Sequence, residues 1–276
     1  MIIYSEKVLS KILDTSINEI NDIAASISDH TKEVTIIRNG KSRIVIKTSN
    51  ALRSILKKIN IRILSTFSVH PSAYGGVKGK STKLNALQHQ GNPYIFQTDL
   101  TSCFNNIPSK RVRILFQKKL KFPPKIANIL TRLTTYNYSI PLGYPTSIAL
   151  VNLIALDMDT NLYNYCSSKK IVYTRFVDDM TFSGKYISER TQKAILDIIK
   201  RNKFKINSKK TVFSQGNKTV LITGINVRRK KLFVNNKIKN NLRLLHYRKK
   251  FLSSDARKKL IRTINGKINY INSIEK

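Results

Sequence analysis

The sequence contains no tryptophan, two cysteines and only 15 acidic residues among its 276. The two cysteines, Cys103 and Cys166, are too few for a disulfide framework or a structural zinc site. No apolar run reaches the roughly 18 residues of a membrane-spanning helix. The first residues also lack the charged segment and apolar run of a signal peptide. The sequence therefore predicts a reduced, cytoplasmic protein with no membrane partner.

The scarcity of acids leaves a very large positive charge. Lysine and arginine together number 51, so the formal net charge is +36. Charge of one sign on this scale repels itself unless a polyanion neutralises it, and nucleic-acid phosphate is the natural polyanion. The many asparagines and isoleucines indicate an AT-rich genome, which inflates lysine but does not explain why acids are so few. We therefore expect a nucleic-acid partner.

Helical and strand-like segments alternate without strand–helix–strand units, which indicates the α+β class. Two β-rich runs flank the pair Asn39-Gly40, which favours a tight hairpin turn. A strand-like run from Tyr94 ends at the acid Asp99, and residues 171–182 have the pattern of a second hairpin with 177–180 at its tip. The other predicted elements are helices over 5–28, 49–64, 110–120, 124–133, 147–158, 189–201 and from 236 onward, a loop over 71–79, and short strands at 220–222 and 232–234.

Three of the few acids are placed for metal chemistry. Asp178 and Asp179 are adjacent at the tip of the predicted 171–182 hairpin, and Asp99 ends an earlier strand. Neighbouring carboxylates repel one another, and a bound cation removes that repulsion. The arrangement suits two-metal phosphoryl transfer, for which Mg²⁺ is the natural ion because it accepts carboxylates together with substrate phosphates. Taken alone, an Asp-Asp pair in a turn is more often simply solvated.

Four segments resemble the motifs of reverse transcriptases, in the order that this family has them. They are DLTSCFNNI at 99–107, PLGYPTS at 141–147 followed by Asn152, FVDD at 176–179 and NSKKT at 207–211. Two more segments, NALQH at 85–89 and ITG at 222–224, resemble signatures of bacterial retron reverse transcriptases. Phe176 stands where tyrosine is usual and Leu142 where glutamine is common, and the second departure puts template or nucleotide handling in question.

The resemblance implies a right-hand polymerase within the α+β class: fingers, an antiparallel palm sheet flanked by helices, and a helical thumb. The implied parts are an N-terminal helical segment at 1–32, fingers at 33–97 with 108–140 interleaved, a palm at 98–107 and 141–227, and a thumb at 228–276. It also implies RNA-directed DNA polymerisation with two Mg²⁺ ions. In that scheme Asp99 and Asp178 bridge the ions, and Asp179 lies outside them or holds only one.

A retron-type enzyme copies part of a cognate structured non-coding RNA, which is both template and primer, into single-stranded DNA. The resemblance therefore implies deoxynucleoside triphosphates as substrates, priming from a guanosine 2′-hydroxyl, and a branched RNA–DNA product (msDNA). It further implies a role in anti-phage defence beside a separate effector protein. Two alternatives stay open: another bacterial reverse transcriptase, of the group II intron or diversity-generating type, and a non-catalytic RNA-binding protein on a polymerase scaffold.

Five residues are candidates for binding the incoming nucleotide. Phe104 resembles the steric gate that excludes a ribose 2′-hydroxyl, and the alternative is a core phenylalanine. Lys41 and Arg43 follow the first hairpin turn and are placed to close on a triphosphate, and Lys80 in a glycine-rich loop is a rival for the same role. Gly143 joins the set through its motif. Any single lysine or arginine in so basic a chain is more often solvated surface.

Candidates for RNA contact lie in three places. Asn85 and His89 are four residues apart, which would put both on one helical face, and a scaffolding role is the equal alternative for His89. Thr223 and Gly224 suit a close backbone approach, since glycine lacks a Cβ. The helical tail carries a basic face beside an apolar stripe, and RNA helices are bound mainly through shape and phosphates. Its candidate residues are Arg243, Arg248, Lys249 and Lys250.

Overall fold

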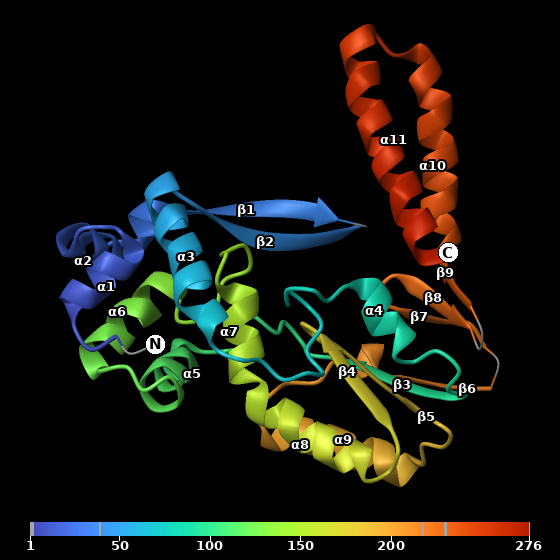
Figure 1. Ribbon diagram of the computed structural model, residues 1–276, viewed down its shortest axis with the longest axis horizontal. Helices are drawn as coiled ribbons and strands as arrows, with labels where there is room; N and C mark the ends of the chain where they lie inside the picture. Colours follow the sequence, from blue (N-terminus) through green and yellow to red (C-terminus); the bar gives the residue numbers. More distant parts are fainter. Residues whose placement is uncertain (1–2, 39, 217, 229–230, 276) are drawn as a thin grey trace.

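The computed structural model describes residues 3–38, 40–216, 218–228 and 231–275. Three groups of elements make up this part of the chain (Figure 1). Helices and a projecting two-stranded ribbon form the first, a four-stranded sheet with its helices forms the second, and a small three-stranded sheet with two long helices forms the third. No helix within these residues combines the length and the apolarity needed to cross a membrane.

The first group begins with three helices whose starts are set by serine. Ser5, Ser16 and Ser49 each accept a hydrogen bond from a backbone N–H in the first turn of the helix that follows, which satisfies donors that a helix start leaves free. These helices are α1 (Glu6–Leu13), α2 (Ile17–Ala25) and α3 (Asn50–Arg62). Their apolar faces join one core with α6 (Pro124–Thr134), so the helices predicted over 5–28, 49–64 and 124–133 are confirmed.

The ribbon consists of β1 (Thr31–Arg38) and β2 (Lys41–Thr48), paired antiparallel from Thr31 opposite Thr48 to Arg38 opposite Lys41. The predicted hairpin is therefore confirmed, although Asn39 of its turn lies outside the described residues. Gly40 has φ +72°, a left-handed value that glycine adopts without steric cost. The ribbon projects from the helices toward the C-terminal elements (Figure 1).

The central sheet has the strand order β4-β5-β3-β6, and every neighbouring pair is antiparallel. Its strands are β3 (Tyr94–Asp99), β4 (Val172–Phe176), β5 (Asp179–Gly184) and β6 (Val212–Gln215). The helices that accompany it are α7 (Ser147–Ile154), α8 (Leu156–Ser167) and α9 (Glu189–Arg201), of which α8 and α9 pack on each other and α8 packs on β4. The predicted strand ending at Asp99 and the predicted 171–182 hairpin are both confirmed.

Two shorter helices complete the body. α5 (Ser109–Ile114) continues as a π-helical turn, η3 (Leu115–Lys119), which confirms the helix predicted over 110–120. α4 (Thr82–Leu87) follows the predicted loop and contacts both β4 and the small sheet. Short 3₁₀ turns lie at η1 (Ile27–His30), η2 (Leu64–Thr66) and η4 (Ser208–Lys210).

The C-terminal group begins with a three-stranded antiparallel sheet of β7 (Val220–Ile222), β8 (Ile225–Arg228) and β9 (Lys231–Val234). Two helices follow, α10 (Asn236–Arg248) and α11 (Ser254–Glu275), joined through η5 (Lys249–Phe251). The end of α11 is fastened to the sheet, because buried Ile274 joins the apolar cluster of β7–β9 and Glu275 accepts a hydrogen bond from the Val234 amide. The rest of the pair stands away from the body (Figure 1), and the predicted helical tail is confirmed.

Candidate active site

Three aspartates meet at one end of the central sheet, where its two inner strands β3 and β5 lie side by side. In the β3–β5 pairing Asp99 lies directly opposite Asp179, so the strand register itself brings two carboxylates together. Asp178 lies in the two-residue turn between β4 and β5, and its carbonyl oxygen accepts a hydrogen bond from the Leu100 amide at 3.0 Å. The chain thus joins residues that are 79 positions apart in the sequence, as expected from a strand-end acid and an acidic hairpin tip.

The carboxylates are close enough to disturb one another. Loss of solvation, followed by repulsion from Asp99, raises the pKa of Asp178. Loss of solvation, followed by repulsion from Asp178 and interaction with Asp99, raises the pKa of Asp179 to about 7. Such shifts mean that the negative forms lack sufficient compensating positive charge. One partial compensation is present, since Lys210 Nζ lies 2.6 Å from Asp99 Oδ2.

This donor set fits divalent cations. It consists only of carboxylate oxygens, which are the ligands that Mg²⁺ prefers, and the raised pKa values are what a nearby cation would reverse. Within the described part of the chain, no three carboxylate, imidazole or thiol groups are already gathered into a metal cluster. Lys210 instead supplies the positive charge beside Asp99. The residues that could hold metal are therefore Asp99, Asp178 and Asp179, with Lys210 as a neighbouring cation.

A cavity of about 320 Å³ opens beside these acids. Its lining brings together Arg43 from the β-ribbon, Phe104 from the turns after β3, and Asp99 and Asp178 from the sheet. Leu142, one of the departures from the family motif, also lines the cavity. Four residues predicted from separate parts of the sequence thus line one space, which brings a cation, an aromatic ring and carboxylates together.

Of the other three nucleotide candidates, two lie elsewhere and one is not described. Lys80 Nζ donates to the carbonyl oxygen of Pro71 and lies 4.2 Å from the ring centroid of Tyr74, so it does not line the cavity. Gly143 packs on the β-ribbon, because a Cβ there would lie 2.7 Å from the Ile46 carbonyl oxygen. The side chain of Lys41 lies outside the described residues.

Two of the lining residues for which the sequence predicted no role contact Asp99 directly. Lys210 and Asn207 both belong to the 207–211 segment, and each contacts Asp99. The Lys210 ammonium lies beside the Asp99 carboxylate, and the backbone N–H of Asn207 donates to the Asp99 carbonyl oxygen at 2.8 Å. The motif supplied a signal for this segment, but lysines are too abundant in this chain for one of them to be singled out without the pairing.

For His89 the structure favours the scaffolding alternative over contact with RNA. Its side chain is fully buried, and its ring nitrogens lie 2.8 Å from Ser183 Oγ and 2.7 Å from Thr174 Oγ1. Helix α4 ends at Leu87, so Asn85 and His89 do not share a helical face. These hydrogen bonds join the segment after α4 to strands β4 and β5, which is the scaffolding role.

Asn85 is also buried, so a role within the fold is favoured for its side chain. Its Nδ2 donates to Thr223 Oγ1 at 3.3 Å, so two candidates for RNA contact bind each other across the α4–β7 boundary. Thr223 and Gly224 both have positive φ, +47° and +85°, and form the tight turn between β7 and β8. Gly224 is exposed, and a Cβ there would meet no atom within 4 Å, so no close approach within the chain explains it.

The basic candidates of the tail lie at the far end of α10 and in η5. The side chains of Arg243, Arg248 and Lys250 are exposed, whereas Lys249 is half-buried. No residue of α10 is buried, and its apolar positions Ile238, Leu242 and Leu245 are half-buried. Because the rest of the described chain covers only part of this apolar stripe, α10 has a surface available to a partner.

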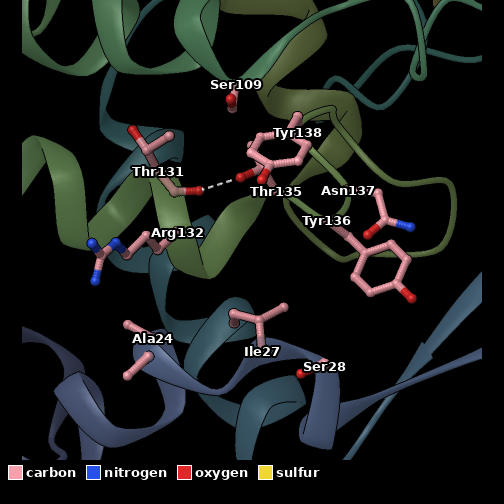
Figure 2. A pocket seen from close by; sticks show the side chains of 11 residues that line it. Ala24, Ile27, Ser28, Ser109, Thr131, Arg132, Thr135, Tyr136, Asn137 and Tyr138 are labelled. Atoms are coloured by element: carbon pink, nitrogen blue, oxygen red, sulfur yellow. Dashed lines mark hydrogen bonds between the residues drawn. The ribbon is translucent and has the colours of Figure 1, made fainter.

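A second, larger hollow of about 600 Å³ lies between α2 and α6, away from the aspartates. Figure 2 shows its hydroxyl-bearing and apolar lining, in which Arg132 is the charged side chain. Thr135 Oγ1 donates to the Thr131 carbonyl oxygen there, so these polar groups are already paired. No carboxylate is among the described residues that line this hollow, so it lacks the cation ligands that the three aspartates supply at the end of the sheet.

His89 makes stability depend on pH. Burial lowers its pKa to about 3 from an ordinary 6.5, so the folded chain keeps the ring neutral while the unfolded chain takes up a proton below about pH 6.5. The contribution of His89 to the free energy of unfolding is therefore fully present above that pH and is lost as the pH decreases.

Between pH 7 and pH 5 we expect the free energy of unfolding to fall by about 2 kcal/mol more in wild type than in His89→Gln. Urea titrations at both pH values measure this difference. His246→Gln, at an exposed histidine, is the control that should behave as wild type. Equal pH dependence in wild type and His89→Gln would contradict the assignment.

Comparison with known proteins identifies the family. The family described as Reverse transcriptase (RNA-dependent DNA polymerase) matches residues 27–227. The retron Ec86 reverse transcriptase of Escherichia coli is 28% identical over 194 residues, covering 70% of this chain and 60% of that protein. The retron Se72 reverse transcriptase of Salmonella heidelberg is 29% identical over 210 residues, covering 74% and 55%. This chain thus spans a little over half the length of these relatives.

Solved structures share the fold at low sequence identity. A telomerase from Candida albicans, in complex with a fragment of telomeric RNA, has a TM-score of 0.56 at 9% identity, over 88% of this chain and 56% of that one. An apo telomerase from Candida tropicalis, truncated from its C-terminal domain, has a TM-score of 0.51 at 11% identity, over 80% and 61%. The fold is that of a right-hand polymerase. The chain belongs to the reverse transcriptase (RNA-dependent DNA polymerase) family, and retron reverse transcriptases are among its relatives.

Proposed function

We propose that the chain is a retron-type RNA-directed DNA polymerase that copies part of a structured RNA into single-stranded DNA. The observation that carries the proposal is the convergence of Asp99, Asp178 and Asp179 beside a cavity whose lining includes the first two of these acids together with Arg43 and Phe104. Relatives named as retron reverse transcriptases favour the retron type over the other bacterial types. A non-catalytic RNA-binding protein would have no need to retain three mutually repelling carboxylates.

The arrangement of the elements in space supports a division into the parts of a right-hand polymerase. We assign residues 1–32 to an N-terminal helical segment, 33–97 with 108–140 to the fingers, 98–107 with 141–227 to the palm, and 228–276 to the thumb. The fingers then include the β-ribbon, and the palm includes the central sheet with its acids. The thumb includes α10 and α11, which stand clear of the body (Figure 1).

Asp99 and Asp178 would hold two Mg²⁺ ions between them, and Asp179 would contact at most one. When bound, the ions would activate the attacking hydroxyl and stabilise the leaving pyrophosphate. The chain's own residues orient the reactants around this centre. Arg43, at the cavity wall, is placed to bind the triphosphate through a planar guanidinium that can contact two phosphate oxygens.

Phe104 is proposed as the steric gate of the cavity. Its half-buried ring lines the space beside Asp99, where a sugar would lie. Replacement by alanine removes the obstacle to a 2′-hydroxyl. We therefore expect the preference for deoxynucleotides over ribonucleotides, as a ratio of kcat/KM values, to fall by about 10- to 100-fold. Primer extension with matched ribo- and deoxynucleotides measures the ratio of kcat/KM values. Phe104→Tyr keeps the ring and should keep the discrimination. Unchanged ribonucleotide incorporation by Phe104→Ala would remove the gate assignment.

The RNA is proposed to bind along the basic thumb helices. Arg243, Arg248 and Lys250 expose positive charge on elements that project from the sheet, and RNA duplexes are held mainly through their phosphates. The retron type further suggests that one RNA supplies both template and primer, that synthesis starts from a guanosine 2′-hydroxyl to give msDNA, and that the product serves anti-phage defence beside an effector protein.

Two measurements test this proposal. Primer extension on a defined RNA template, with Mg²⁺ and deoxynucleotides, should yield DNA; failure to extend would favour a non-catalytic RNA-binding protein. Sequencing the nucleic acid that co-purifies with the chain from its host should reveal RNA joined to DNA through a 2′–5′ branch. Plain cellular RNA in its place would return the chain to the broader class of bacterial reverse transcriptases.

A further inference from the structure

The turn that carries Asp178 has a strained backbone. Phe176 pairs with Asp179, which leaves Val177 and Asp178 as a two-residue turn. Val177 has φ +61°, a left-handed value that a β-branched residue adopts rarely and at an energetic cost. Such a conformation persists only where the surroundings hold it.

One buried arginine holds this turn from beneath. Arg175 has no exposed side-chain surface, and its Nη1 donates to the Val177 carbonyl oxygen at 2.9 Å. The opposite side of the guanidinium forms a two-point ion pair with Asp159 on α8: Nε donates to Oδ1 at 2.9 Å and Nη2 to Oδ2 at 2.6 Å. The guanidinium is planar and rigid, so fixing one edge on Asp159 fixes the direction in which Nη1 points.

Asn152 ties the same guanidinium to the glycine-rich loop. Its Oδ1 accepts from Arg175 Nη1 at 3.0 Å, and its Nδ2 donates to the Gly75 carbonyl oxygen at 3.0 Å. Gly75 in turn lies against the strained residue, because a Cβ at position 75 would lie 2.5 Å from Val177 Cγ2 and 2.7 Å from the Val177 amide nitrogen. Val177 is thus held by a hydrogen bond on its carbonyl side and by close packing on its amide side.

We infer that Arg175, fixed by Asp159 and Asn152, is a positioning residue that sets the backbone of the Val177–Asp178 turn and so presents Asp178 for cation binding. The inference rests on the proposed function, since it assumes that Asp99, Asp178 and Asp179 bind metal. Arg175 itself does not line the 320 Å³ cavity. Its effect passes through one carbonyl oxygen, directly before Asp178.

The test compares metal binding by the full chain and by Arg175→Lys. Lysine keeps the positive charge near Asp159, but one ammonium cannot reach Asp159, Asn152 and the Val177 carbonyl together. Loss of such an outer hydrogen bond typically weakens metal affinity by about tenfold or more, so we expect the Kd for Mn²⁺, measured by electron paramagnetic resonance of the free ion, to rise by about that factor. The Mg²⁺ concentration for half-maximal primer extension should rise in parallel, while RNA affinity and the KM for nucleotide stay within about twofold.

Tyr173→Phe is the matched control. It removes the hydrogen bond that Tyr173 donates to Asp159 Oδ1 at 2.7 Å, within the same buried network, but leaves the contact to Val177 intact. Thermal unfolding should show both variants destabilised, with weakened Mn²⁺ binding only in Arg175→Lys. Equal Mn²⁺ affinity in wild type, Tyr173→Phe and Arg175→Lys would overturn the inference.

Gly75→Ala repeats the test with the buried ion pair intact, in case Arg175→Lys does not fold. Its added methyl must displace Val177, so Mn²⁺ affinity should again fall. Wild-type Mn²⁺ affinity in Gly75→Ala would likewise count against the inference. Wild-type primer extension is scored separately: if wild type binds Mn²⁺ but makes no DNA, the proposed function fails while the Mn²⁺ comparison still decides the role of Arg175.

Discussion

Asp178→Asn is expected to lower the rate of RNA-templated primer extension by about a thousandfold or more. The substitution keeps the shape of the side chain but removes a negative charge from the point where Asp99 and the turn converge. Metal-ion stabilisation of the attacking and leaving oxygens contributes several kcal/mol, and each 1.4 kcal/mol is about tenfold in rate. Single-turnover extension on an RNA template, at saturating nucleotide, measures the loss directly.

The control for this experiment is Asp22→Asn, at an exposed position on α2 outside the cavity. It makes the same change in net charge and should extend primers at the wild-type rate. RNA binding by Asp178→Asn should be retained, because removing an acid from a site near phosphate does not weaken a cationic surface. Extension by Asp178→Asn at the wild-type rate would show that the three acids are not the catalytic centre.

Local features of this fold could be predicted from the sequence because they depend on neighbours in the chain. Ser5, Ser49 and Ser188 accept hydrogen bonds from the helices that follow them, and a cap needs only its own first turn. The β-ribbon could also be predicted, since an Asn-Gly pair between β-rich runs specifies a hairpin by itself. Asp99 and Phe104 could be predicted from their spacing within one motif.

Contacts between residues far apart in the chain could not be predicted from the sequence. The choice of Lys210 as the partner of Asp99 depends on β3, η4 and β6 lying side by side, and the chain has many other lysines. His89 was placed on a helical face because its spacing from Asn85 suits one, yet α4 ends two residues before it and the ring enters the core. Burial is a property of the whole fold, so a polar residue in a short motif gives no sign of it.

Arg175 shows the same limit most clearly. In the sequence it is one of 51 basic residues and sits in a predicted strand. The structure buries it completely against Asp159, sixteen residues earlier on α8. Burial would lower the pKa of Arg175, but the charge of Asp159 outweighs that effect and raises it. A charge is tolerated in such a core only when paired, so removing one partner leaves an uncompensated buried charge.

Asp159→Asn is therefore expected to lower the free energy of unfolding by about 3–5 kcal/mol, because it leaves the Arg175 guanidinium buried without its counter-charge. Urea unfolding at neutral pH measures the loss. Asp157→Asn is a close control: it lies two residues away on α8 and pairs with Lys119, but its side chain is 63% exposed. Breaking an exposed pair costs about 1 kcal/mol or less. Equal losses in the two variants would contradict the role given to the buried pair.

The double variant Asp159→Leu with Arg175→Met separates stability from function. Replacing both members of a buried ion pair by apolar side chains is often neutral, since it removes the desolvation cost together with the attraction. We expect the double variant to recover most of the unfolding free energy that Asp159→Asn loses. It cannot recover the hydrogen bond to the Val177 carbonyl, so its affinity for Mn²⁺ should stay low. A double variant that is stable and also binds Mn²⁺ like wild type would show that the turn keeps its shape without Arg175.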